Sequence, residues 1–229
     1  MDNNTFILVS SLLALFFLIK IVKQISVNKL KRRLAECIIN DEGEAAYMSV
    51  LDSGKTRMVL SAYYIDFLKM EYHMLARNKA QAIELYEKII SYPKPRFGDL
   101  ITVHRQAIAF FVENDEPDMA LDAFDKISGV LLFKKTKQNL ALYQDLKLYI
   151  DVYVHKDVGR LDDCLALIEA ADDSEAKAVH RFRAAKLYYY MGEIDKCSDM
   201  LELAAEQSTN KVFLEQVDRI LAGRYEELE

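Results

Sequence analysis

Cysteine, histidine and carboxylate side chains are the groups in this sequence that could perform chemistry, and their spacing predicts neither a metal centre nor a catalytic one. The cysteines are odd in number, lie far apart and form no Cys-x-x-Cys pair: Cys37, Cys164 and Cys197. No two histidines stand three or four residues apart, as a metal-binding helix face would need: His73, His104, His155 and His180. The sequence contains no glycine-rich phosphate loop. These patterns predict that the protein is not an enzyme and uses no cofactor, metal or small-molecule substrate.

The composition predicts the elements that must position any functional side chain. The 229 residues include only 7 Gly and 3 Pro, which is low for a β protein with frequent turns. Hydrophobic residues make up 52% and charged residues 29%, which argues against a disordered chain. We therefore expect an all-α fold of long helices and short connections. The net charge of −6 argues against nucleic acid as a partner.

Charge is distributed unevenly between the N-terminal segment and the rest of the chain. Residues 1–33 contain one acid and six cations, which leaves 24 of the 30 cations and 35 of the 36 acids to residues 34–229. The six cations are Lys20, Lys23, Lys29, Lys31, Arg32 and Arg33. The acidic remainder should repel anionic lipid and favour a neutral or basic partner, with binding that salt weakens.

An apolar run at residues 6–22 predicts a single uncleaved transmembrane helix. Only Lys20 interrupts it, and at about 1.5 Å per residue it is just long enough to cross a bilayer core. One alternative is a buried core helix, and the other is a cleaved signal peptide. A signal peptide would have cations before the apolar run and small residues after it. All six cations lie at or beyond the end of the run, which places the N-terminus outside and residues 23–229 in the cytoplasm. A topology signal is the simpler interpretation of this basic cluster, and contact with anionic lipid is the other.

Beyond this segment, hydrophobic periodicity predicts paired helices. We expect them at 59–76 with 79–91, 100–113 with 116–128, 137–156 with 160–171 and 175–191 with 193–207, and a last helix near 211–226. The second helices align on a small residue, at Ala82, Ala120, Cys164 and Cys197. A large apolar residue follows four positions later, at Tyr86, Phe124, Ile168 and Leu201. This spacing puts both residues on one helix face, where the small one allows a neighbouring helix to approach closely.

The repeated pattern resembles the tetratricopeptide repeat (TPR), a helix–turn–helix unit of about 34 residues. The last unit matches best, because Ala185, Tyr188, Gly192, Cys197 and Leu201 fit the family's first helix, turn and second helix. The resemblance implies a right-handed helical solenoid of about four antiparallel helix pairs. We therefore divide the chain into a short extracytoplasmic tail at 1–5, a transmembrane helix at 6–22, a basic juxtamembrane segment and N-terminal cap at 23–57, and a TPR-like domain at 58–229.

The first helices of these units carry an excess of aromatic residues. Three consecutive tyrosines at 188–190 span about 200° of a helix, so one core-facing stripe cannot hide them all. In the TPR family, first helices line a concave groove that holds a partner. The groove residues that this register predicts are Phe182, Lys186 and Tyr189, with Tyr149 and Tyr153 one unit earlier. The resemblance implies that they bind a protein or peptide.

The function predicted from these features is that of a membrane-anchored adaptor or assembly factor that binds a partner protein on the concave face of a cytoplasmic TPR-like domain. The alternative is a membrane-tethered chaperone or import-receptor-like protein for unfolded or targeting segments. An adaptor would bind one partner with a defined stoichiometry, whereas a receptor would bind many segments in shallow apolar pockets. The TPR subtype that clamps a C-terminal carboxylate is disfavoured, because the first helices of the first two units lack the asparagines that it uses.

Overall fold

The computed structural model describes residues 23–93 and 97–229, and every regular element among them is a helix. This confirms the all-α fold class. The predicted transmembrane helix at 6–22, with Lys20, lies outside the described residues. Within the described part of the chain, no helix combines the length and the hydrophobicity needed to cross a membrane. The chain divides into two compact units, with the border between Val103 and His104, inside α6 (Phe97–Glu113).

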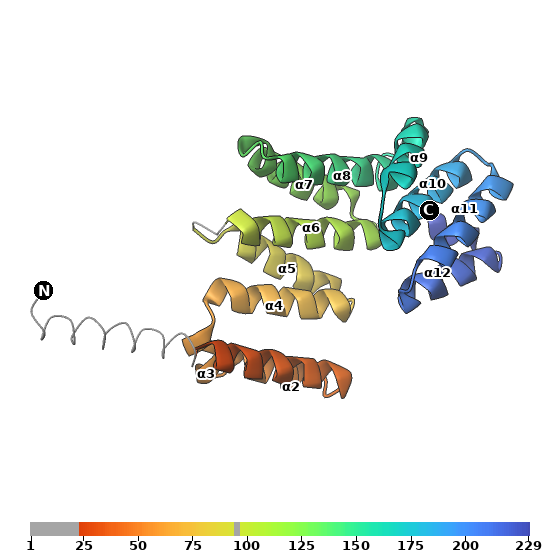
Figure 1. Cartoon of the computed structure of the whole chain (residues 1–229). Helices are drawn as coiled ribbons and strands as arrows, with labels where there is room; N and C mark the ends of the chain where they lie inside the picture. The colour runs from red at the N-terminus through yellow and green to blue at the C-terminus, as the bar shows by residue number, and fades with distance from the viewer. Residues whose placement is uncertain (1–22, 94–96) are drawn as a thin grey trace, which may run out of the picture. The chain divides into compact units, whose positions relative to one another are not determined.

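The first unit builds its core from short and long helices that follow one another closely. They are a helix over residues 23–39, α2 (Glu44–Asp52), α3 (Gly54–Val59), α4 (Ala62–Leu75) and α5 (Lys79–Ile90) (Figure 1). α4 and α5 pack side by side. Leu34, Leu51 and Ile65 form one buried cluster, and the ring of Tyr47 stacks on that of Tyr72 with 4.5 Å between centroids. The segment predicted as an N-terminal cap therefore shares a core with α4.

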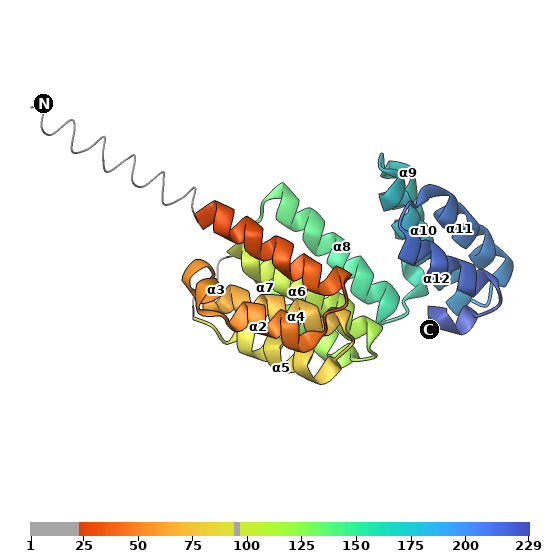
Figure 2. The same cartoon turned by 90° about the horizontal axis from the view of Figure 1, so that it is seen from below.

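The second unit is organised around one central helix, α10. Its elements are the part of α6 that follows Val103, α7 (Pro117–Phe133), α8 (Lys137–Tyr153), the 3-10 helix η1 (Val158–Arg160), α9 (Leu161–Ala170), α10 (Ser174–Tyr190), α11 (Ile194–Gln207), α12 (Lys211–Leu221) and the 3-10 helix η2 (Tyr225–Leu228) (Figure 2). α8 packs on α7, α9 and α11 both pack on α10, and α12 packs on α11. One buried cluster around Cys164 joins α8, α9 and α10, and another around Leu201 joins α10, α11, α12 and η2.

The alignment of the second helices has a structural counterpart in their burial. The four small residues, Ala82, Ala120, Cys164 and Cys197, are all fully buried, as the alignment predicts. The large residue that follows four positions later is also buried in three of the four helices, at Tyr86, Ile168 and Leu201. A small buried side chain at such a position allows the main chain of a neighbouring helix to approach closely.

The turns between paired helices repeat as well. Arg77, Asp115 and Gly192 each adopt a positive φ, of 54°, 56° and 75°. In each case the next residue donates its N–H to the carbonyl five positions back: Asn78 to His73, Glu116 to Phe111 and Glu193 to Tyr188. This is a helix-ending motif in which one left-handed residue lets the chain reverse. The turn after α8 differs, because the N–H of Asp157 donates to the carbonyl of Asp151 six positions back.

Three elements differ from the sequence prediction. α7 was expected to end at residue 128, but it continues to Phe133 because its buried stripe, Ala123, Ile127 and Leu131, runs past Gly129. Burial of Leu131 outweighs the cost of about 1 kcal/mol for glycine inside a helix. The last helix ends at Leu221 instead of 226, since the chain leaves the helical region at Gly223, where φ is 106°. α9, expected to pair with α8, packs along α10.

Candidate functional site

Tyrosine side chains of α8 and α10 gather beside the ammonium group of Lys186. Tyr149 and Tyr153 lie one turn apart on α8, and their rings stack with 4.3 Å between centroids. The Nζ atom of Lys186 lies 4.9 Å from the centroid of the Tyr153 ring and 5.6 Å from that of Tyr190. Contact between a cation and an aromatic face is favourable, the more so away from water. We call Tyr149, Tyr153, Lys186, Tyr189 and Tyr190 the Lys186 site.

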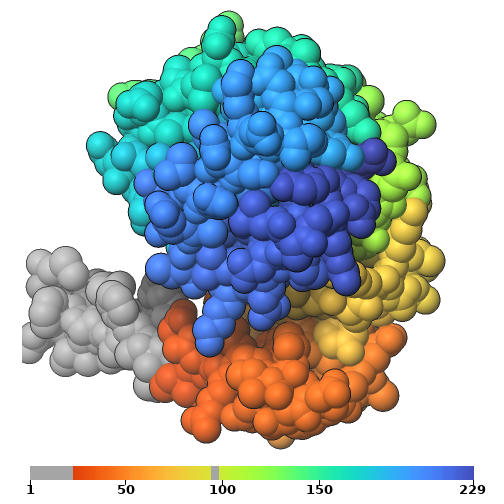
Figure 3. Space-filling view, turned by 90° about the vertical axis from the view of Figure 1, so that its right-hand side faces the viewer, coloured from red at the N-terminus to blue at the C-terminus, as the bar shows by residue number. Residues whose placement is uncertain are grey.

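The Lys186 site holds the C-terminal segment of the same chain, residues 224–229. Nζ of Lys186 donates to the main-chain carbonyls of Leu228 and Glu229, the latter at 3.3 Å. The hydroxyl of Tyr190 donates to the Leu228 carbonyl at 3.0 Å, and that of Tyr189 to the Glu229 carboxylate at 3.3 Å. The Leu228 side chain is fully buried in the cluster of α10, α11 and α12. Figure 3 shows this end of the chain, in the darkest blue, at the molecular surface.

Lys186 is unusual because its side chain is only 5% exposed. Burial, and then the nearby charge of Lys156, lower the pKa of Lys186 to about 8, while Glu229 acts in the opposite direction. Burying an ammonium group is costly unless it gains partners, and here the two carbonyls and two rings supply them. Burial also raises the pKa values of Tyr149 and Tyr190, so both hydroxyls remain protonated donors at neutral pH. The site can therefore recognise main-chain carbonyls and a carboxylate.

Phe182, which the sequence register directs toward the groove, lies in the core of the second unit instead. It is 7% exposed, and its ring meets that of Phe213 on α12 edge to face at 5.4 Å between centroids. It belongs to the same cluster as Leu228, so it supports the surface on which the C-terminal segment lies. The prediction that Phe182 faces a groove is wrong because α12 packs against the face of α10 that carries Phe182.

Three participants in the site were missed by sequence reasoning: Arg183, Tyr190 and the C-terminal segment. Arg183 is buried, donates to Asp145 at 2.7 Å and lies with its guanidinium carbon 5.8 Å from the centroid of the Tyr149 ring. It therefore connects α10 to α8. Arg183 precedes Lys186 by three residues, and Tyr190 follows it by four. Residues at these spacings are neighbours on a helix, so the spacing could have predicted that both lie near Lys186. Nothing local marks residues 224–229, apart from a single leucine among glutamates.

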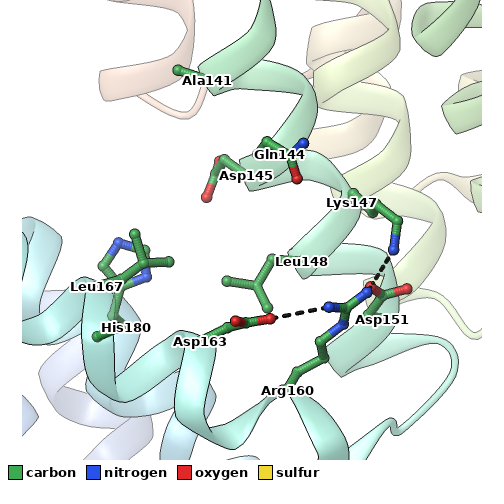
Figure 4. A pocket seen from close by; sticks show the side chains of 11 residues that line it. Ala141, Gln144, Asp145, Lys147, Leu148, Asp151, Arg160, Asp163, Leu167 and His180 are labelled. Carbon is green, nitrogen blue, oxygen red and sulfur yellow. Dashed lines mark hydrogen bonds and ion pairs between the residues drawn. The ribbon is translucent and has the colours of Figure 1, made fainter.

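A hollow with a volume of about 620 Å³ opens between α8, α9 and α10 (Figure 4). Leu148 and Leu167 contribute apolar surface. The charged residues around it are paired with one another: Asp151 with Lys147 at 2.9 Å and with Arg160 at 2.7 Å, and Asp163 with Arg160 at 3.0 Å. Burial and the charge of Arg183 lower the pKa of His180 at its edge, which keeps that imidazole neutral.

The predicted membrane-flanking cations behave differently from one another in the first unit. Lys23, Lys29 and Lys31 are exposed. Arg32 pairs with Glu36 at 2.9 Å on the surface of the same helix. Arg33 donates to both carboxylate oxygens of Glu42 at 2.6 Å, which ties the helix end to the following turn. This bidentate contact gives Arg33 a structural task besides its charge.

Burial determines the protonation of two cysteines and of His104. All three cysteines are buried and free, and burial raises the pKa of Cys164 and of Cys197 to about 11, which keeps both as neutral thiols. Burial, and then the nearby charge of Lys126, lower the pKa of His104 to about 4. Among residues 23–93 and 97–229, no cluster of His, Cys, Asp or Glu side chains is arranged to hold a metal ion.

Comparisons with protein-family models, with curated proteins and with solved structures found no match to this chain. The geometry of the Lys186 site is therefore the basis for assigning a function. That site positions donors on a helix face against an irregular peptide segment, which is an arrangement suited to binding.

Proposed function

We propose that this protein is a membrane-anchored adaptor that binds a segment of a partner protein at the Lys186 site, on the concave face of a TPR-like right-handed solenoid. The buried small residues of the aligned helices and the three equivalent turns support a repeated architecture. The packing of α10 against α11 supports the assignment of these helices as one unit. The single observation that carries the binding site is the buried lysine that donates to main-chain carbonyls of residues 224–229.

A segment of another protein could make the contacts that residues 224–229 make at this site. Lys186 and Tyr190 donate to carbonyl oxygens, which every peptide has, whereas the pocket for Leu228 and the contact of Tyr189 with Glu229 select for an apolar residue followed by an acid. A partner segment with this order of groups would therefore make the same contacts. Lys186, Arg183 and Lys156 make this place locally cationic within the acidic domain, which favours an acidic segment.

The C-terminal segment is attached in a way that allows exchange. Gly223, with φ at 106°, separates it from α12, and η2 is a single 3-10 turn. Leu228 is its one fully buried side chain. Its other contacts include the hydrogen bonds of Glu227 with Arg219 and of Tyr225 with Ser198. A short element with one fully buried side chain opens at a lower free-energy cost than a packed helix. The segment competes with a partner at an effective concentration in the millimolar range, which sets the affinity that the partner has to exceed.

Releasing this segment should open the site to a peptide added in solution. In the full chain, Leu228→Asp would put a charge into an apolar cluster, which is costly, so the segment should leave the site. We expect this variant to bind a labelled peptide with the sequence of residues 223–229 with a dissociation constant on the order of 10 μM, and the unsubstituted protein to bind it at least tenfold more weakly. Fluorescence anisotropy measures both values.

Two further variants make this result specific. Adding Lys186→Met to Leu228→Asp should weaken peptide binding by about tenfold or more, since the charge-assisted donor is lost. Val212→Asp is the matched control, because it adds the same charge at an exposed position of α12 and should leave the site closed. Equal binding of a scrambled peptide would favour the receptor-like alternative, and absence of binding by a Leu228→Asp chain with intact helical circular dichroism would refute the site.

The membrane anchor and its orientation are tested separately. We expect the full chain to resist extraction by alkaline carbonate, and a protease added outside intact cells or organelles to leave residues 23–229 undigested. The physical reason is the apolar run at 6–22 followed by six cations that favour the cytoplasmic side. Extraction by carbonate would contradict the anchor, and digestion of the domain from outside would reverse the orientation.

A further inference from the structure

The turn between α7 and α8 displays a large apolar side chain to solvent. Phe133, the last residue of α7, is 87% exposed, and Lys134, Lys135 and Lys137 follow it and are exposed as well. We call these four residues the Phe133 tip. α7 positions the tip by continuing past Gly129, so that Leu131 faces the core while Phe133 projects beyond it. A phenylalanine so exposed forfeits the burial that normally stabilises this side chain, unless another surface covers it.

The turn that carries the tip is well defined by its own hydrogen bonds. The side chain of Thr136 accepts a hydrogen bond from the N–H of Asn139 at 3.1 Å and so caps α8. The Asn139 side chain donates to the carbonyl of Lys134 at 2.6 Å. These bonds hold the residues between Phe133 and α8 in one conformation, so the phenylalanine is presented at little further cost in conformational entropy.

The tip is also a basic island in an acidic domain. Residues 129–144 contain three cations and no acid, whereas residues 34–229 as a whole contain 35 acids and 24 cations. Lysines around a projecting aromatic ring are the chemistry of contact with an anionic membrane, because the lysines are attracted to the lipid charge and the ring enters the interface. An acidic protein segment would be attracted by the charge of the lysines but gives no general reason for the phenylalanine.

A similar arrangement occurs in the first unit, considered by itself. Met58 on α3 is 86% exposed, and Lys55 and Arg57 beside it are exposed. α3 lies at the same end of that unit as the start of the helix over residues 23–39, which is drawn in red in Figure 1 and Figure 2. Because the predicted membrane helix ends at residue 22, this end of the unit is the one that would lie nearest the membrane.

We propose that the Phe133 tip is a second membrane contact, which inserts Phe133 into the headgroup region of an anionic bilayer. The contact would orient the second unit on the bilayer surface. The proposal adds a lipid-binding surface to the proposed adaptor, and it uses the anchor only as the device that keeps the tip near a bilayer. Since residues 34–229 as a whole contain 35 acids and 24 cations, the exposed lysines of the tip would favour the side of the second unit that carries them as the side facing an anionic lipid surface.

The chain contains no tryptophan, so Phe133→Trp creates a single fluorescent reporter at the tip. We would reconstitute the full chain into phosphatidylcholine vesicles with about one third phosphatidylserine, and into vesicles of phosphatidylcholine alone, each with a brominated lipid. The expected result is a blue-shifted emission and quenching by about twofold or more in the anionic vesicles, and little change in the neutral ones. Val212→Trp is the matched control, since Val212 is 75% exposed and lies outside the basic island.

Three lysine substitutions added to the Phe133→Trp parent test the charge, and we call the resulting chain the triple variant. Phe133→Trp with Lys134→Glu, Lys135→Glu and Lys137→Glu should lose the quenching while its resistance to carbonate extraction stays the same. The proposal is overturned if the tip reporter is quenched no more than the Val212→Trp control in anionic vesicles, or if the triple variant is quenched as strongly as its parent. Failure of the anchor gives a different result, because the chain would then be extracted by carbonate whatever the reporter shows.

Discussion

Replacing Phe182 by alanine should lower the free energy of unfolding by about 3–5 kcal/mol, because it removes a ring from the buried cluster of α10, α11, α12 and η2. The ring is almost fully buried and meets Phe213 edge to face, so its loss removes apolar contacts and leaves a cavity between α10 and α12. Urea denaturation followed by circular dichroism measures the change. Phe133→Ala is the matched control, since the same truncation at an exposed position should change stability by less than about 0.5 kcal/mol.

This result would decide how the Lys186 site has to be probed. If Phe182→Ala is as destabilising as we expect, loss of partner binding in that variant reports on folding as well as on contact. Tyr189→Phe is the sharper probe, because it removes only the hydroxyl that donates to Glu229. A stability change below about 1 kcal/mol in Phe182→Ala would contradict the core position that we assign to this ring.

The pH dependence of stability should reveal the buried ammonium group of Lys186. The pKa of Lys186 is about 8 in the folded chain, whereas the ordinary lysine value of 10.5 applies to the unfolded chain. The unfolded chain therefore binds this proton more tightly than the folded chain does. The resulting penalty on folding is complete below pH 8 and disappears as the pH rises to 10.5. Lys186→Met removes it. We therefore expect the stability of Lys186→Met relative to the unsubstituted protein to be greater at neutral pH than at pH 10.5, by about 3 kcal/mol.

The comparison has to be a difference between the two proteins. Buried thiols with raised pKa values, Cys164 and Cys197, lower the stability of both proteins above about pH 9 and cancel in the difference. Lys211→Met, at an exposed position of α12, is the control and should give a difference that does not vary with pH. A flat difference for Lys186→Met as well would mean that the ammonium group is solvated and that the C-terminal segment does not cover it.

The features of the fold that the sequence could predict are those that depend on neighbours within a few turns. Helices recur with a period that local hydrophobic patterns carry, and residues such as Ala82 and Cys197 stand out because only a small side chain suits a close helix approach. The end of α7 was missed for the opposite reason. Gly129 is a local signal for a break, and burial of Leu131 against the rest of the unit outweighs it.

The placement of some side chains of the Lys186 site could be predicted from the sequence, for the same physical reason, and their role in binding stays a prediction. The i, i+4 spacing places Tyr149 beside Tyr153, so the sequence alone determined that these rings would meet on α8. It also placed Lys186 and Tyr189 on one face of α10. Which surface would cover that face was decided only by tertiary structure, because the covering residues, Leu228 and Glu229, lie about forty positions further along the chain. No local sequence pattern predicts that residues 224–229 run back to cover α10. This arrangement depends on α12 ending at Leu221 and on the buried cluster that several helices form together.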